Sequence, residues 1–346
     1  HSAGYRSVRV GGVNAPLAIP TLGPLRDARG RSKRKLRVSL TDRCNLQCLY
    51  CMPEHPKWLP REQILRRDEL VRLVRLFVTE LGVREIRLTG GEPLLRRDVV
   101  DIVAELHALR GLGLERIAMT SNAARLAPVA ADLRRAGLDD INISIDSITP
   151  ARFRELTNGD IAPVQAGIVA ARAAGLTVKL NSVAIRGYND DELLPLLRWA
   201  YTQDLPLRFI EFMPLDGRGF WNREKVIEQA EILAMARQAF TVTPLPRTAE
   251  PADYVLLDGR FRLGIIPTIS NPFCSSCDRV RLSATGELYA CLFSAAGRDL
   301  KTPLREGADD QALASAIRQH IWHKEAGYAE RSGYVERPIT MHRLGG

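Results

Sequence analysis

The chain has 346 residues, of which 45% are hydrophobic and 26% are charged, and this composition is typical of a globular protein. The formal net charge of +9 favours an anionic partner, such as a phosphorylated small molecule or nucleic acid. No stretch approaches the roughly 18 continuous apolar residues of a membrane-spanning helix. The length favours one large α/β domain with an appendage, or two domains.

Residues 1–34 are rich in Gly, Pro and Arg and lead into the basic run RGRSKRK. We interpret them as an irregular N-terminal arm, and the basic run as a solvated tail rather than a patch that binds nucleic acid. The start of the chain contains no continuous apolar core of a secretory signal. We therefore expect a cytoplasmic protein.

From residue 35, short apolar strands alternate with helical patterns. Strands are expected at 35–40, 85–90, 116–121, 141–146, 177–185 and 207–214. Helices are expected between the first two strands and at about 98–109, 125–136, 162–174 and 190–202. This alternation predicts parallel strands joined by right-handed crossovers and covered on both faces. Periodicity alone leaves two architectures open, a doubly wound sheet and an incomplete (β/α)6 barrel.

Polar or ligand-like residues follow every expected strand, and they favour the barrel. They include Thr41 to Cys44, Gly90 to Glu92, Thr120 to Asn122, Ser144 and Asp146, Lys179 and Asn181, and Glu211 and Met213. One site at the carboxyl ends of barrel strands accounts for all of them. We therefore predict an α/β fold in which residues 35–240 form an incomplete TIM-type barrel.

The pattern changes after residue 214. A helix is expected at 226–240, then a Pro-rich connector, a hairpin with an Asp258-Gly259 turn and a helix at 309–324. We assign residues 241–346 to a C-terminal extension that binds a metal cluster.

The six cysteines form two sets of three, which we call the first set (Cys44, Cys48, Cys51) and the second set (Cys274, Cys277, Cys291). Such clustering favours metal ligation in a reducing compartment over disulfide bonding.

The first set lies in the motif CNLQCLYC. Iron–sulfur cubane clusters normally take four thiolates, so three leave one iron open to another ligand. An open iron is what reductive cleavage of S-adenosylmethionine requires. The motif resembles that of the radical S-adenosylmethionine superfamily, and GGEP after the second strand supports this resemblance.

The second set has two interpretations. A structural zinc site could be completed by a distant histidine, and His320, His323 and His342 are candidates. Alternatively, the three cysteines hold a second metal cluster. Arg279 and Arg281 favour the latter, because residues two apart on a strand face the same side and would bind an anion beside the cluster.

From Leu36 to Gly346 the sequence resembles the GTP 3′,8-cyclases of molybdenum cofactor biosynthesis. The motifs TDRCNLQCLYCMP, IRLTGGEPLLRRD, INISID, IEFMPLD and CSSCDRVRLSATGELYACLF and the terminal Gly-Gly carry the resemblance. It implies that an adenosyl radical removes the C3′ hydrogen of GTP, after which C3′ bonds to C8 of guanine. Reduction and protonation would give (8S)-3′,8-cyclo-7,8-dihydroguanosine 5′-triphosphate.

The resemblance also implies two [4Fe–4S] clusters, each held by one set of three cysteines, with S-adenosylmethionine at the first. Positions that match cofactor contacts are Tyr50, Gly91, Ser144 and Met213. Positions that match GTP contacts are Arg37, Arg87, Thr120, Lys179 and the stretch Arg279, Val280 and Arg281. The terminal Gly345 and Gly346 match a tail that inserts toward the active site and, with Arg279 and Arg281, supports catalysis.

Two features depart from the family pattern. TSNA at 120–123 replaces the usual Thr-Asn-Gly, so the turn there is expected to differ, and the N-terminal arm has no assigned role.

The implied partners are GTP, a reductase or flavodoxin-type electron donor, and the downstream cyclic pyranopterin monophosphate synthase. A homodimer is the assembly we consider, and neither a membrane nor a nucleic-acid partner is expected. Two alternatives stay open: a radical enzyme with an auxiliary cluster that acts on a peptide, and a zinc-binding nucleic-acid protein.

Overall fold

The structure, a computed structural model, describes residues 18–327 and 340–345. The strands are β1 Lys35–Ser39, β2 Glu85–Thr89, β3 Arg116–Ser121, β4 Asp140–Ser144, β5 Thr177–Ala184, β6 Leu207–Glu211, β7 Val242–Pro244, β8 Asp253–Leu257, β9 Phe261–Ile266, β10 Arg279–Leu282, β11 Glu287–Tyr289 and β12 Arg298–Asp299. The helices are α1 Arg67–Thr79, α2 Val99–His107, α3 Ala130–Ala136, α4 Pro150–Thr157, α5 Ile161–Ala173, α6 Leu193–Gln203, α7 Gln229–Arg237, α8 Lys301–Arg305, α9 Asp310–Trp322 and α10 Met341–Leu344.

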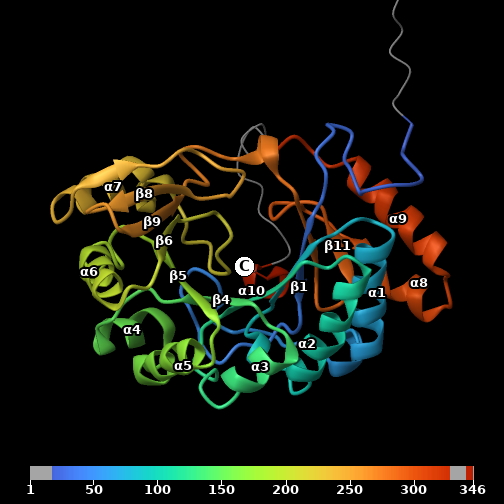
Figure 1. Cartoon of the computed structure of the whole chain (residues 1–346), viewed down its shortest axis with the longest axis horizontal. Coiled ribbons are helices and arrows are strands. Elements are labelled where there is room, and N and C mark those ends of the chain that lie inside the picture. Colours follow the sequence, from blue (N-terminus) through green and yellow to red (C-terminus); the bar gives the residue numbers. More distant parts are fainter. Residues whose placement is uncertain (1–17, 328–339, 346) are drawn as a thin grey trace, which may run out of the picture.

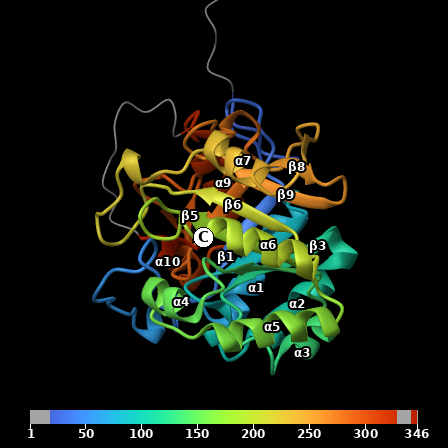
Figure 2. The same ribbon diagram turned by 90° about the vertical axis from the view of Figure 1, so that its left-hand side faces the viewer.

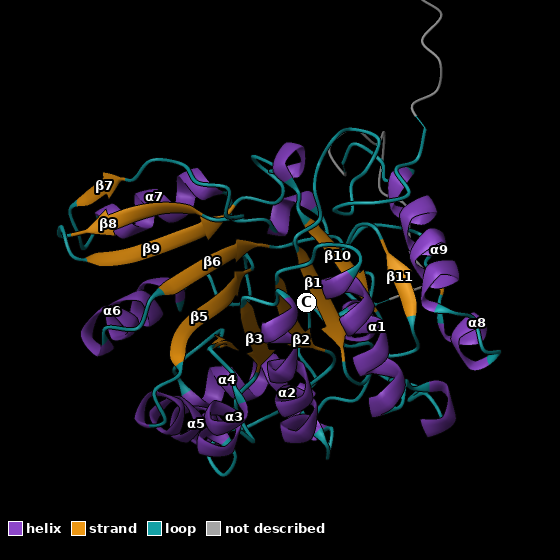
Figure 3. Cartoon of the chain, turned by 45° about the vertical axis from the view of Figure 1, so that its right-hand side comes forward, coloured by secondary structure: helices purple, strands orange, loops and turns teal. Residues whose placement is uncertain are grey.

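The strands make one curved sheet in the order β12-β11-β10-β1-β2-β3-β4-β5-β6-β9-β8-β7 (Figure 3). β1 to β6 follow one another in chain order and pair in parallel, whereas a doubly wound sheet would reverse its order part-way. The incomplete TIM-type barrel is therefore confirmed. Helices α1 to α6 lie around the outside of the sheet (Figure 1).

The C-terminal part continues the same sheet. β10 pairs in parallel with β1, and β9 pairs in parallel with β6, so the barrel has eight adjacent parallel strands rather than six. Both additions come from residues that the sequence pattern assigned to the extension. The hairpin of β8 and β9 is confirmed, and its turn has positive φ at Asp258 and Gly259, as a type I′ turn requires.

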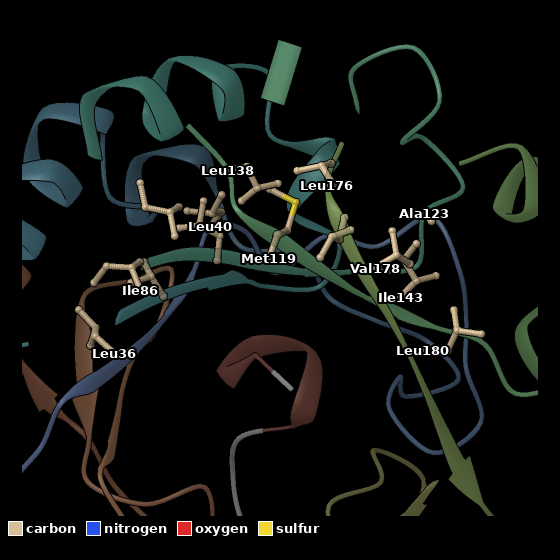
Figure 4. Packing of buried hydrophobic residues seen from close by; sticks show 14 of the residues in the cluster. Leu36, Leu40, Ile86, Met119, Ala123, Leu138, Ile143, Leu176, Val178 and Leu180 are labelled. Atoms are coloured by element: carbon tan, nitrogen blue, oxygen red, sulfur yellow. The ribbon is translucent and has the colours of Figure 1, made fainter. Parts of the chain in front are cut away.

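We expected apolar groups to cover both faces of the strands, and this expectation is wrong. Leu36 and Val38 of β1 are fully buried in the layer under the helices, while Arg37 between them faces the concave side. β5 shows the same alternation. Figure 4 shows part of the apolar layer, with the short helix α10 on the other side of the sheet. An incomplete barrel leaves its inner face for ligands, so charged residues persist there.

The basic run at the end of the N-terminal arm is also not a solvated tail. Leu25, Asp27 and Lys33 are each at most 1% exposed, and a β-bridge joins Arg26 to Ser32. We call residues 27–33 the N-terminal turn. The turn lies beside α9, where the amide of Ala28 donates to the carbonyl of Trp322 at 3.1 Å (Figure 1). Residues 1–17 lie outside the described part.

None of the helices in the described ranges has the length and apolar character needed to cross a bilayer.

Candidate active site

Three arginines lie side by side on the concave face of the sheet. Arg37 of β1 is in register with Arg281 of β10 on one side and with Arg87 of β2 on the other. Burial, followed by the nearby guanidinium groups of Arg281 and Arg279, lowers the pKa of Arg37 well below its ordinary value. Such a row of like charges favours an anionic ligand, because mutual repulsion is relieved only by negative charge.

The cations differ in how far the protein neutralises them. Arg87 pairs with Asp140 at 3.4 Å and donates to the Met119 carbonyl at 3.1 Å, and burial lowers its pKa to about 10. Arg37 has neither a hydrogen bond nor an ion pair among the described residues. A half-buried arginine without a partner is costly unless a ligand supplies the counter-charge.

The opposite side of the concave face adds two more cations. Lys179 of β5 is in register with Asn142 of β4, which is itself in register with Thr120 of β3. Burial, then the charge of Arg208, lowers the pKa of Lys179. We did not predict Arg208 from the sequence. Arg208 lies inside the apolar strand β6, as Lys179 lies inside β5. A search for cations within apolar strands would have identified it.

The first set of cysteines follows β1 in a loop that packs on the GGEP turn. A Cβ atom on Gly91 would lie 2.3 Å from the carbonyl oxygen of Arg43, so only glycine fits there. The Glu92 carboxylate accepts from Ser121 Oγ and the Asn122 amide, each at 2.8 Å. Glu92 thus joins the loops after β2 and β3 beneath the cysteines.

The first set lies among carboxylates. Burial raises the pKa of Cys44 to about 11, and the charge of Glu92 adds to this. Burial also raises the pKa of Cys48 well above its ordinary value, with Cys51 and Asp146 contributing. The Tyr50 hydroxyl donates to Asp146 Oδ2 at 2.7 Å. The sequence placed Glu92 and Asp146 among the polar residues at the strand ends, but it assigned no role to either.

The second set lies at the open end of the β10–β11 hairpin, opposite its Thr285-Gly286 turn. Cys274 and Cys277 form a single turn before β10, and the amide of Cys277 donates to the carbonyl of Cys274 at 3.2 Å. Arg281 is in register with Tyr289, so continuing the antiparallel pairing by two residues brings Cys291 opposite Arg279. This register places Cys291 at the same end of the hairpin as Cys274 and Cys277.

Cations surround the second set. Burial raises the pKa of Cys277, but the charges of Arg279 and Lys324 outweigh burial and lower this pKa to about 6. Lys33 Nζ donates to the Cys277 carbonyl at 2.7 Å, and Arg31 Nη1 donates to the Cys274 carbonyl at 2.8 Å. The N-terminal turn therefore holds this loop.

The C-terminal tail reaches the row of arginines. Helix α10 lies inside the curved sheet (Figures 1 and 2). The Gly345 carbonyl accepts a hydrogen bond from Arg281 Nη1, and a Cβ on Gly345 would lie 2.0 Å from Thr89 Oγ1. Gly346 lies outside the described residues.

Comparison with known proteins identifies the family. A family model described as the radical SAM superfamily matches residues 38–200, and one described as Molybdenum Cofactor Synthesis C matches residues 205–330. GTP 3′,8-cyclase 2 of Mycobacterium tuberculosis is 44% identical over 349 residues, covering 98% of this chain and 96% of that protein. GTP 3′,8-cyclase of Streptomyces coelicolor is 44% identical over 328 residues, covering 92% and 96%.

The chain belongs to the GTP 3′,8-cyclase family. As a member of the radical SAM superfamily, the protein uses S-adenosylmethionine and an iron–sulfur cluster as cofactors. Neither alternative, a peptide-modifying enzyme or a zinc-binding nucleic-acid protein, agrees with this membership. Among solved structures, SuiB of Streptococcus suis bound to its precursor peptide SuiA aligns with a TM-score of 0.59 and 11% identity, covering 86% of this chain and 66% of that one. This likeness concerns the fold alone.

Both cysteine sets of this GTP 3′,8-cyclase family member carry free thiols. All six thiols are free of disulfide bonds and partly exposed. In the described part of the chain, no three His, Cys, Asp or Glu side chains lie close enough to bind one metal ion. A cubane cluster differs from a single ion because each thiolate binds its own iron. Polar contacts to sulfur are present at both sets, from Asn122 Nδ2 to Cys44 at 3.7 Å and from Lys324 Nζ to Cys277 at 3.2 Å.

One of the candidate histidines for the second set, His342, lies elsewhere. His342 is buried edge-on against Trp58, with ring centroids 6.2 Å apart, beside the loop of the first set. His320 lies on α9 near the backbone of Leu288.

The remaining expected positions lie at strand ends or on the wrong face. Ser144 ends β4, and Met213 follows β6. The Val280 side chain is fully buried in the apolar layer, so only its backbone faces the site. In the TSNA turn, Ala123 has φ of +59°, the left-handed conformation that glycine adopts more easily.

Proposed function

We propose that this protein converts GTP into (8S)-3′,8-cyclo-7,8-dihydroguanosine 5′-triphosphate, the first step of molybdenum cofactor biosynthesis. The observation that supports this most is the row of Arg281, Arg37 and Arg87, with Arg37 left without a partner. A nucleoside triphosphate carries about four negative charges, which suits such a row. Its relatives named GTP 3′,8-cyclase support the same substrate.

In this proposal the GTP contacts are made by Arg37, Arg87, Thr120, Lys179, Arg279, Arg281 and the backbone of Val280, and we add Arg208. The arginines would hold the triphosphate, since planar guanidinium groups bind phosphate oxygens in pairs. Lys179 and Arg208, across the concave face, would hold the other end of the nucleotide.

We further propose that each set of cysteines binds one [4Fe–4S] cluster. S-Adenosylmethionine at the first cluster supplies the radical that removes the C3′ hydrogen. Tyr50, Gly91, Ser144 and Met213 would bind this cofactor, with Asp146 orienting Tyr50 through its hydrogen bond. Gly345, and Gly346 beyond it, would close the site over the substrate through Arg281.

The partners and units are proposals as well. A reductase or flavodoxin-type protein would donate the electrons, and a cyclic pyranopterin monophosphate synthase would take the product. Six free thiols suit the reducing cytoplasm. We keep residues 1–34, 35–240 and 241–346 as functional units, although one sheet joins the last two.

Anaerobic turnover tests the activity directly. The reconstituted protein is incubated with dithionite, S-adenosylmethionine and GTP, and both products are followed by chromatography and mass spectrometry. We expect 5′-deoxyadenosine and the cyclised nucleotide to form together and only when GTP is present. Formation of 5′-deoxyadenosine with no change in GTP would contradict the proposal.

The phosphate site has its own test. Replacing Arg281 by Ala should weaken GTP binding roughly 10–100-fold, since a hydrogen bond to a charged group is worth about 1.5–3 kcal/mol. Arg135→Ala, which removes an exposed arginine of α3 on the outside of the sheet (Figure 1), is the control. Equal affinities of the two variants in equilibrium dialysis would rule out this phosphate site.

A further inference from the structure

Lys324 lies at the centre of the cationic surroundings of the second set. It follows α9, and its residue is only 6% exposed. Its Nζ lies 3.2 Å from Cys277 Sγ and 3.1 Å from the carbonyl oxygen of Arg279. No carboxylate in the described part of the chain pairs with this ammonium group.

The N-terminal turn fixes Lys324 relative to the cysteines. Arg31 Nη1 donates both to the Cys274 carbonyl at 2.8 Å and to the Ala326 carbonyl at 2.7 Å. One guanidinium group thereby ties the cysteine loop to the segment that carries Lys324. Asp27 accepts from Arg31 Nε at 2.7 Å and pairs with Lys33 at 2.8 Å, both buried.

This network leaves positive charge beside the sulfur. Among the described residues, Arg31 and Lys33 share one carboxylate partner, Asp27. In the same part of the chain, the positive charges of Lys324 and Arg279 act on Cys277 without a carboxylate in an ion pair with either of them. Hydrogen bonds to ligand sulfurs and nearby charge set the reduction potential of an iron–sulfur cluster. Since reduction adds negative charge, a fixed ammonium group stabilises the reduced form.

We propose that Lys324 is a positioning residue that donates a hydrogen bond to the Cys277 thiolate and raises the reduction potential of the second cluster. The inference rests on the proposed function, which assigns a cluster to the second set. The cluster takes one electron from a low-potential donor, and no bond in the protein breaks. The N-terminal turn holds Lys324 in place and so acquires a role.

The test isolates the second cluster in the full-length chain. The three cysteines of the first set are replaced by Ala, and iron content is measured after anaerobic reconstitution without S-adenosylmethionine or GTP. The one-electron titration of this parent is then followed by EPR. The same measurement is made with Lys324 replaced by Met, by Gln and by Arg. Lys301→Met is the control, since Lys301 is a lysine of α8 that donates to the Gln63 carbonyl at 2.9 Å.

At the midpoint potential of the parent, Lys324→Met should lower the ratio of reduced to oxidised cluster about tenfold, which is about 59 mV for one electron. Lys324→Gln should fall in between, while Lys324→Arg and the control stay within about twofold of the parent. A Lys324→Met variant with full iron content and an unchanged ratio would overturn the proposal.

Loss of the cluster is also informative. If Lys324→Met binds no iron while Lys324→Arg does, the positioning role is supported. If all three variants lose iron, the position matters only for packing and the proposal fails. A parent without any iron would instead refute the second cluster of the proposed function, before Lys324 is tested.

Discussion

The two sets of cysteines have the same ligands but opposite electrical surroundings. At the first set, burial raises the pKa values of Cys44 and Cys48, and the charges of Glu92 at Cys44 and of Asp146 at Cys48 add to this. At the second set, the charges of Arg279 and Lys324 lower the pKa of Cys277 to about 6. Sequence spacing alone therefore does not define such a site, since residues far along the chain set its charge.

The electrical difference matches a division of labour. Negative surroundings disfavour adding an electron, so the first cluster would be a strong reductant, as cleavage of S-adenosylmethionine requires. Positive surroundings suit the binding of GTP phosphates beside the second set.

Removing one cysteine from each set should have the largest effect on the reaction. Cys48→Ala should reduce formation of 5′-deoxyadenosine to background, because the first cluster would be lost. Cys277→Ala should abolish the cyclised nucleotide while S-adenosylmethionine is still cleaved slowly. Iron analysis and chromatography of both products check this. Identical product profiles from the two variants would show that the sets do not divide the work.

A second test removes the carboxylate that organises the second set. Asp27→Asn should destabilise the protein by about 3–5 kcal/mol, because it leaves buried Arg31 and Lys33 without their partner. Urea unfolding of the metal-free chain measures this. Asp191→Asn is the control, since its ion pair with Arg152 is exposed and should cost less than about 1 kcal/mol. Similar midpoints for both variants would contradict the buried network.

A third test measures how the stability of the chain depends on pH through Glu92, which lies beside the first set. Burial raises the pKa of Glu92 to about 7 from 4.5, despite three hydrogen-bond donors. The folded state therefore binds more protons than the unfolded state between these pH values. The stability from this group is fully present below pH 4.5 and is lost as pH rises through about 7.

Between these pH values the free energy of unfolding of the metal-free chain should fall by about 3 kcal/mol more than that of the Glu92→Gln variant. Urea unfolding at pH 4.5 and 7.5 gives the comparison. Glu231→Gln is the control, because Arg186 lowers the pKa of the exposed Glu231 and its small effect has the opposite sign. If Glu92→Gln has the same dependence of unfolding free energy on pH as the unsubstituted chain, the raised pKa of Glu92 is contradicted.

The smallest effect concerns packing under the first set. Gly91→Ala should destabilise the metal-free chain by about 1–3 kcal/mol, because its methyl group meets the backbone of Arg43. Gly111→Ala is the matched control, since nothing lies within 4 Å of a Cβ there. Thermal unfolding of both variants checks the difference. A Gly91→Ala midpoint equal to that of the control would mean that the two loops do not pack closely.

Much of this protein was predictable from local sequence. The six expected strands agree with β1 to β6 within a few residues, because apolar runs and intervening helical periodicity are local properties. The first set of cysteines and the GGEP motif follow β1 and β2, as the sequence predicted, and the iron–sulfur cluster expected there agrees with the family. A cluster at the second set stays a prediction. The short helices α4, α8 and α10 escaped prediction, since helices of four to eight residues carry too little periodic pattern.

By itself, the sequence determined the alternating strands and helices, the two sets of thiols and the cations inside apolar strands. Only the tertiary structure decided that β9 and β10 extend the barrel, that the N-terminal turn holds the second set, and that Gly345 meets Arg281. The physical reason is separation along the chain. Arg31 and Cys274 are 243 residues apart, and such a contact leaves no periodic trace in either segment.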